Sequence, residues 1–191
     1  MDDYHIHTNA TEGEMSPEEI IRQAKAMKIK TIAFTEHISK EPTYDWFEFK
    51  KKINNLNVNG IRVLVGIEAK VLDEDSSLNV NDDILNASDI VLGAVHGNGN
   101  VEWLLNSKCD IIAHPQINSK NIKNFINCNK ILEISSRHRL PFNVLDKLVI
   151  DTNNVFSFGS DAHTIEDFVN AQKYFREIIR RYPNIKMIKY I

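Results

Sequence analysis

The segment Asp3-Tyr4-His5-Ile6-His7 combines a short strand pattern with two histidines at alternating positions. Side chains two residues apart on a strand point to the same side, so His5 and His7 are expected to face one surface together. The segment Ala33-Phe34-Thr35-Glu36-His37 again ends an apolar run with a histidine. These two segments predict β-strands that carry imidazoles at their carboxyl ends.

The same arrangement recurs along the chain. Seven short runs rich in Ile and Val cover residues 4–7, 31–35, 63–71, 90–95, 111–114, 131–135 and 155–159. Such short, poorly alternating runs are typical of parallel strands that are buried on both faces. Six of the seven histidines stand at the ends of these runs, namely His5, His7, His37, His96, His114 and His163, and the run at 63–71 carries Glu68.

Amphipathic stretches lie between the predicted strands. Ser16-Pro17-Glu18-Glu19 is typical of a helix start, with Ser as the cap, Pro at the first position and Glu at the third. A last helix is expected from Thr164 until Pro183 stops it. Weaker helical patterns cover residues 44–56, 101–107, 119–127 and 141–150, and 82–87 is expected to form at most a turn or two.

This alternation of strands and helices predicts an α/β protein. A compact β/α barrel and an open doubly wound sheet both fit it. In a barrel the carboxyl ends of the strands meet at one mouth, whereas an open sheet would string the histidines along an edge. Because metal coordination needs side chains that converge, the histidine pattern favours the barrel.

Composition limits the class of protein. The 191 residues contain no linker-like, repetitive or low-complexity segment, so a single domain over 1–191 is expected. The hydrophobic share of 42% and charged share of 26% exclude a disordered chain, and the net charge of −3 argues against a strongly basic nucleic-acid binder. The chain has no signal region and no apolar run of about 18 residues, so a cytoplasmic protein without a membrane partner is expected.

The polar residues at the predicted strand ends suit divalent metal ions. Imidazoles combined with carboxylates are typical ligands of zinc, manganese and iron. The candidate ligands are His5, His7, Glu12, His37, Glu68, His96, His114, Asp161 and His163. One ion takes three or four protein ligands, so this set predicts two or three ions.

At these residues the chain resembles the PHP family, the polymerase-and-histidinol-phosphatase phosphoesterases. The first motif of that family is similar to Asp3-Tyr4-His5-Ile6-His7-Thr8, and the second to Phe34-Thr35-Glu36-His37, with Glu36 where the family usually has Asp. The later motifs resemble Gly66-Ile67-Glu68, Val95-His96-Gly97, Ala113-His114-Pro115 and Gly159-Ser160-Asp161-Ala162-His163. The resemblance implies a distorted seven-stranded (β/α)7 barrel whose site usually holds three metals.

The resemblance also implies how the ligands are shared. One metal would be bound by His5, His7, Glu68 and Asp161. A second would take Glu68, His96 and His114, so that Glu68 bridges the two. A third would take Glu12, His37 and His163, with Glu12 where the family usually has Asp.

Such a site suits phosphate chemistry. Three divalent ions and three carboxylates would leave a net positive charge, which complements a phosphate monoester dianion. Coordination lowers the pKa of bound water towards about 7, so we hypothesise that a metal-bound hydroxide bridging two ions attacks phosphorus. The cysteines, Cys109 and Cys128, precede predicted strands at the opposite end and are expected to be packing residues.

Three residues follow the predicted strand that carries no ligand at its end, Arg137, His138 and Arg139. We expect the arginines to contact phosphate oxygens and His138 to serve as a general acid, the alternative being a solvated basic loop. Lys70 is a further candidate substrate contact. Glu133 lies within the predicted strand that precedes this basic loop, and it is a candidate partner of a ligand histidine.

The expected substrate is a small phosphomonoester, as in histidinol phosphatases. The acidic run Asp73-Glu74-Asp75 is expected to border the mouth and to repel a long polyanion, although nucleotides and short oligonucleotides stay possible. The segment 44–47 could form a wall for a ring, but its aromatic side chains are expected to be buried against the next helix. The alternatives are a phosphodiesterase or 5′–3′ exonuclease on short oligonucleotides, a metal-dependent amidohydrolase, and a non-catalytic metal-binding subunit.

Overall fold

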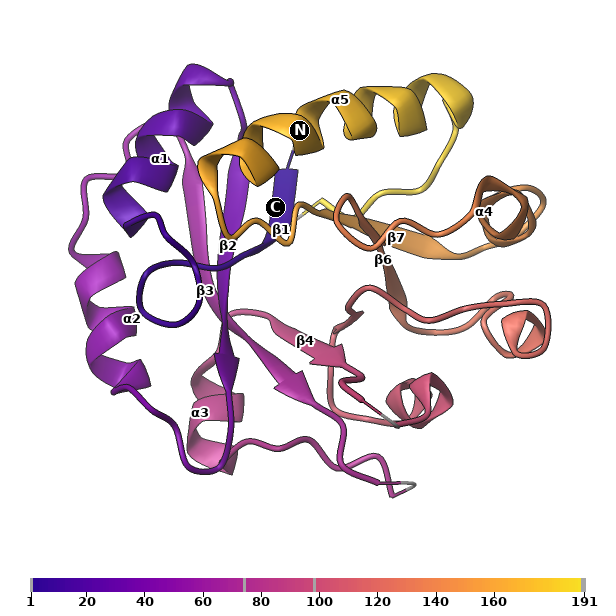
Figure 1. Ribbon diagram of the computed structural model, residues 1–191, viewed down its shortest axis with the longest axis horizontal. Helices are drawn as coiled ribbons and strands as arrows, with labels where there is room; N and C mark the ends of the chain where they lie inside the picture. Colours follow the sequence, from indigo (N-terminus) through magenta and orange to yellow (C-terminus); the bar gives the residue numbers. More distant parts are fainter. Residues whose placement is uncertain (1, 74, 98, 190–191) are drawn as a thin grey trace.

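The computed structural model describes residues 2–73, 75–97 and 99–189. Its seven strands form one parallel sheet in chain order (Figure 1). They are β1 (Asp2–Ile6), β2 (Thr31–Ile38), β3 (Arg62–Lys70), β4 (Val91–Ala94), β5 (Ile111–Ile112), β6 (Ile131–Ser135) and β7 (Val155–Gly159). All seven predicted strands are therefore present, and β5 is shorter than its apolar run.

The sheet curves until its first and last strands meet. Just beyond the ends of β1 and β7, the main-chain N–H of His7 donates to Ala162 O at 3.1 Å, and that of Asp161 donates to His5 O at 2.8 Å. The Asp3 carboxylate extends this contact, since its Oδ1 accepts from the main-chain N–H of Ser160 at 2.9 Å. The nearly closed barrel is thus confirmed over the open doubly wound sheet.

Helices connect the strands on the outside of the barrel (Figure 1). They are α1 (Pro17–Ala26), α2 (Trp46–Asn54), α3 (Asp82–Ala87), α4 (Phe142–Val149) and α5 (Ile165–Arg181), with 3-10 turns η1 (Val101–Leu105) and η2 (Ile122–Asn124). The helical patterns at 101–107 and 119–127 thus form only 3-10 turns. In the second, Asn side chains compete with the main chain, as when Asn121 Oδ1 accepts from the N–H of Asn118 at 2.8 Å.

Two helix starts follow the capping rules that the sequence indicated. Ser16 accepts from the N–H of Glu19, whose side chain accepts from the N–H of Ser16. Thr164 and Asp167 form the same reciprocal box at the start of α5. Asp167 Oδ2 also accepts from the N–H of His163 at 3.2 Å, so the start of α5 is joined to the segment that follows β7.

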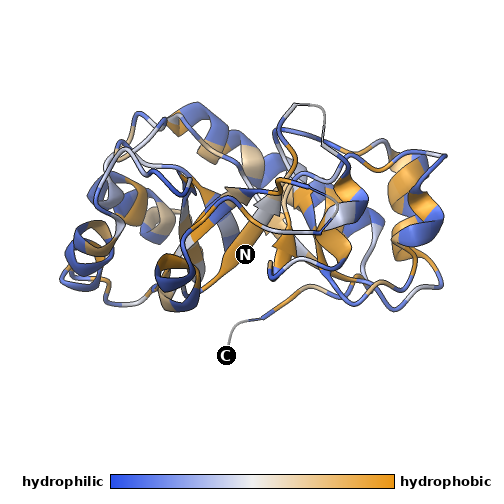
Figure 2. Ribbon diagram, turned by 90° about the horizontal axis from the view of Figure 1, so that it is seen from below, coloured by the Kyte–Doolittle hydropathy of each residue, from blue (hydrophilic) through white to orange (hydrophobic). Residues whose placement is uncertain are grey.

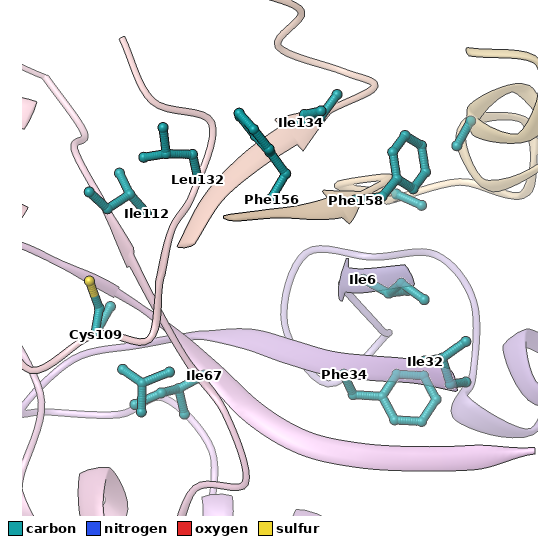
Figure 3. Close-up of a cluster of buried hydrophobic side chains, with 14 of the residues drawn as sticks. Ile6, Ile32, Phe34, Ile67, Cys109, Ile112, Leu132, Ile134, Phe156 and Phe158 are labelled. Carbon is teal, nitrogen blue, oxygen red and sulfur yellow. The ribbon is translucent and has the colours of Figure 1, made fainter. Parts of the chain in front are cut away.

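Apolar side chains on both faces of the sheet fix the barrel. Those on the outer face pack against the helices (Figure 3), as where Phe158 lies 4.8 Å from the ring of Phe175 on α5. A second buried cluster includes Ala33, Leu64 and Leu92, which share the inner face with the residues two and four positions further along each strand. The strands are accordingly mostly hydrophobic, whereas the helices carry both kinds of residue (Figure 2). Within the described residues, no helix has both the length and the apolar character needed to cross a membrane.

We expect Phe158→Ala to lower the free energy of unfolding by about 3–5 kcal/mol, because it leaves a cavity beneath α5. The matched control is Val169→Ala on the exposed side of the same helix, where Val169 is 43% exposed and the change should stay within about 0.5 kcal/mol. Urea unfolding followed by circular dichroism measures both. Equal unfolding midpoints for the two variants would contradict this account of the core.

Candidate metal centre

Four side chains from three strands surround one point at the barrel mouth. His5 lies on β1 and His7 directly follows it, Glu68 comes from β3, and Asp161 from the segment after β7. The Nε2 atoms of His5 and His7 are 3.1 Å apart. Glu68 Oε2 lies 3.4 Å from the former and 3.5 Å from the latter, and Asp161 Oδ1 lies 3.4 Å from His7 Nε2. The sequence-predicted residues of this group are therefore brought together.

The other carboxylate oxygen of Glu68 faces a second group. Glu68 Oε1 lies 2.8 Å from Nε2 of His114 and 3.5 Å from Nε2 of His96. His96 follows β4 and His114 follows β5, so three neighbouring strands converge here. One buried carboxylate thus serves two sets of imidazoles, one through each oxygen.

A third group lies further out. Glu12, from the loop after β1, has its Oε2 3.7 Å from His37 Nε2 and 4.0 Å from His163 Nε2. The ring of His7 stacks on that of His37 at 4.4 Å and lies 4.5 Å from that of His163, which joins this group to the first. Glu12 has a side chain that is 68% exposed, so this group borders solvent.

The electrostatics of the centre follow from burial and from the mixture of charges. Burial opposes ionisation of Glu68, but the imidazoles of His5, His114 and His37 hold its pKa well below the usual value. Burial would lower the pKa of His5, yet the surrounding carboxylates raise it well above its usual value. His7 has its pKa lowered to about 4, mainly by burial, so its imidazole is neutral near pH 7.

The donor set fits divalent cations. In three subsets of these residues, one nitrogen or carboxylate oxygen of each member lies within 4.8 Å of those of the others. The subsets are His7, His37 and His163; His5, His7 and Asp161; and His37, Glu68 and His96. Two buried atoms of the centre, Glu68 Oε2 and His7 Nδ1, take part in no hydrogen bond of ordinary geometry within the described residues, although Glu68 Oε2 lies 2.9 Å from His37 Nδ1. A cation shared by these side chains would complete the coordination of the carboxylate oxygen.

The basic loop after β6 forms the opposite wall of a cavity of about 670 Å³. Arg137, His138 and Arg139 all line it, together with ligand candidates and a small apolar surface. His138 Nε2 lies 3.4 Å from Asp161 Oδ2. Lys70 is exposed and is not among the residues that line this cavity.

The acidic run was expected to border the mouth, but the one of its described residues that lines a cavity, Asp75, lines a different one. Asp75 lines a separate cavity with Lys40 and Lys108, and Glu74 is outside the described residues. Of the 44–47 segment, Trp46 is buried as expected and donates to Gly66 O at 3.4 Å, but Phe47 is 46% exposed because it lies on the outer side of α2, so the expected burial was wrong for Phe47. The aromatic side chains of the 44–47 segment do not line the cavity at the metal centre.

Two further buried carboxylates, Glu36 and Asp3, hold segments of the centre in place, a role that the sequence did not indicate. Glu36 is buried and accepts from the N–H of Thr8 at 2.8 Å and from the Thr11 hydroxyl, so it holds the loop that carries Glu12. Burial raises its pKa, which these hydrogen bonds oppose. Asp3 lies at the β1–β7 seam, and burial raises its pKa to about 7. Asp3 lies in the first family motif and Glu36 in the second, and these positions were the signal by which the sequence could have identified them.

Comparisons with known proteins agree with this geometry. The chain is 26% identical to a "Probable phosphatase" of Thermoanaerobacter sp. (strain X514), over 86% of this chain and 80% of that protein. It is 25% identical to an uncharacterised protein of Methanocaldococcus jannaschii, over 89% of this chain and 84% of that protein.

A solved structure shares the fold. It is histidinol phosphate phosphatase from Lactococcus lactis, complexed with zinc, L-histidinol and phosphate, and it superimposes with a TM-score of 0.74 at 16% identity. The match covers 97% of this chain and 94% of that chain. The family model of the PHP domain matches residues 3–182, and the chain therefore belongs to the PHP family.

Proposed function

We propose that this protein is a metal-dependent phosphoesterase that hydrolyses a small phosphomonoester. The observation that carries the proposal is the position of Glu68, a buried carboxylate with one set of imidazoles at each of its oxygens. The relatives named as phosphatases, and the zinc, histidinol and phosphate in the structural neighbour, support the same chemistry. Two or three ions of zinc, manganese or iron are the proposed cofactors.

The ligand sets follow the three groups. His5, His7, Glu68 and Asp161 would hold one ion, and Glu68, His96 and His114 a second. Glu12, His37 and His163 would hold a third. Bound divalent ions supply an acidic water and neutralise charge on phosphoryl oxygens.

The residues of the basic loop act on the substrate side. Arg139 stacks on Tyr174 with its guanidinium carbon 4.3 Å from the ring, and its Nε donates to Ser136 O at 2.9 Å. This anchoring leaves its terminal nitrogens for phosphate oxygens. Arg137 lies 3.0 Å from Asp167, so it orients the segment of His163 in addition to adding positive charge.

His138 is placed to protonate the leaving oxygen. It lines the cavity beside Asp161 and has a side chain that is 58% exposed, so a proton can reach it from solvent. Burial and the charge of His114 lower the pKa of its imidazole, which makes its protonated form a stronger acid. A proton from His138 would turn the departing alkoxide into an alcohol.

The cavity favours a compact substrate. Its remaining wall is formed by Val95, Gly97, Pro115, Gln116 and Leu140, and among the described residues the imidazoles are its only aromatic rings. A nucleobase would find no stacking platform there. Histidinol phosphate is the first candidate substrate, and a diester or a short oligonucleotide is the runner-up.

We expect phosphatase activity on p-nitrophenyl phosphate and histidinol phosphate with manganese or zinc, and its loss in Asp161→Asn. Val169→Ala is the control variant, because Val169 lies on the exposed face of α5. A panel that includes bis(p-nitrophenyl) phosphate, nucleotides and short oligonucleotides measures the preference. Faster cleavage of the diesters would favour the exonuclease alternative, and inertness towards every ester would favour the non-catalytic one.

The metal content of two variants distinguishes Glu68, which faces two candidate groups, from Glu12, which belongs to one. We expect Glu68→Gln to lose more than one ion per chain after dialysis, since Glu68 faces two groups, and Glu12→Gln to lose at most one. Elemental analysis of the purified proteins measures the stoichiometry, and circular dichroism checks that both variants are folded. Equal losses in the two variants would contradict a bridging role for Glu68.

Substrates with different leaving groups test whether His138 acts as the general acid. We expect His138→Asn to lower kcat for an alkyl phosphomonoester by about 100-fold, because alkoxide needs a proton to leave. The effect on p-nitrophenyl phosphate should be small, since p-nitrophenolate is a stable leaving group. Equal effects on both substrates would show that His138 does not act as the acid.

A further inference from the structure

Glu133 on β6 joins two of the candidate metal groups. It is buried, and its Oε1 lies 2.8 Å from Nδ1 of His5, which is also buried. Its Oε2 accepts a hydrogen bond from the main-chain N–H of His114. His5 belongs to the group with His7 and Asp161, and His114 to the group with His96. One carboxylate therefore contacts a member of each group.

The contact with His5 decides which ring nitrogen carries a proton. A carboxylate accepts hydrogen bonds, so in the neutral imidazole that can bind a metal the proton lies on Nδ1 of His5. The lone pair is then on Nε2, which is the nitrogen 3.4 Å from Glu68 Oε2 and 3.1 Å from His7 Nε2. Glu133 thus directs the metal-binding nitrogen of His5 towards the other ligands.

The contact with His114 acts on the backbone. His114 has a φ of +27°, a left-handed conformation that is costly for a residue with a side chain. The hydrogen bond from its N–H to Glu133 holds the chain in this conformation. The imidazole is thereby presented to Glu68 Oε1, 2.8 Å from His114 Nε2.

The neighbouring strand leaves room for this carboxylate. Gly159 on β7 has no side chain, and a Cβ atom there would lie 1.8 Å from Glu133 Oε1 and 2.7 Å from His5 Cβ. Any larger residue at 159 would displace the carboxylate from its position beside His5. The glycine is therefore a second, independent sign that the structure accommodates Glu133 at this place.

We propose that Glu133 is a positioning residue that orients His5 and His114 together, so that both metal groups are ready to bind at the same time. The inference rests on the proposed metal-dependent function. It assigns to Glu133 no contact with substrate and no proton transfer.

The test compares zinc binding by the wild type and by Glu133→Gln, using calorimetric titration of the metal-free proteins. The amide keeps the size of the side chain but offers only one acceptor, so it can satisfy His5 or His114 and not both. We expect zinc affinity to fall about 10- to 100-fold. The control is Ser157→Ala, which alters the residue paired with Glu133 in the β6–β7 ladder and should leave zinc affinity unchanged.

The outcomes separate this inference from the proposed function. Wild-type zinc binding and phosphatase activity, together with unchanged zinc affinity in Glu133→Gln, would overturn the inference and leave the function standing. A wild type that binds no divalent ion would overturn both. Weak zinc binding by a Glu133→Gln protein whose metal-free unfolding midpoint equals that of the wild type would support positioning rather than a general loss of structure.

A second measurement needs no variant, in case the substitution prevents folding. Imidazole ¹⁵N spectra of the zinc-loaded wild type report the protonation of each ring. We expect His5 to carry its proton on Nδ1 and to bind zinc through Nε2. Coordination of His5 through Nδ1 would overturn the proposal, because that nitrogen would then be unavailable to Glu133.

Discussion

The carboxylate of Glu68 lies buried at the barrel mouth, with imidazole nitrogens from β1, β2 and the ends of β4 and β5 within 3.5 Å of its oxygens. A buried anion is costly unless cations or hydrogen-bond donors compensate it, and here the compensation comes from histidines that belong to distant segments. The strands must therefore converge for this residue to be tolerated. The charge balance at Glu68 connects the barrel architecture to the proposed chemistry.

Closure of the barrel and assembly of the centre share the same atoms. The main-chain bonds at the seam join His5 to Asp161 and His7 to Ala162, so the contact between first and last strands fixes the positions of the candidate ligands His5, His7 and Asp161. Asp161 has a φ of +52°, which turns the chain sharply after β7. Because these candidate ligands lie on the seam, a change that opens the barrel would also separate the first candidate metal group.

The exposure of the candidate ligands increases from the interior of the barrel to its mouth. His5 and Glu68 lie inside with almost no exposure, whereas His96 and Glu12 have side chains that are 43% and 68% exposed. The proposed substrate would therefore approach from the side of the cavity formed by the loops after β4, β5 and β6. That side is also where Arg139 and His138 line the wall, so the residues proposed to act on substrate are separate from the buried carboxylates Glu36, Asp3 and Glu133.

Much of the fold was predictable from the sequence, because strands, helix caps and strand-end histidines are local patterns. Short runs rich in Ile and Val predicted seven parallel strands, and Ser16 with Glu19 predicted the start of α1. The metal-ligand candidates followed from one further rule, that carboxyl ends of barrel strands share a mouth.

Only the tertiary structure decided which distant side chains contact one another. His5 and Glu133 are 128 positions apart, Arg137 turned out to pair with Asp167, and Asp75 lines a separate cavity. Local pattern determines which way a side chain points from its strand, but its partner depends on barrel curvature and on loop paths, which are set by packing over the whole chain.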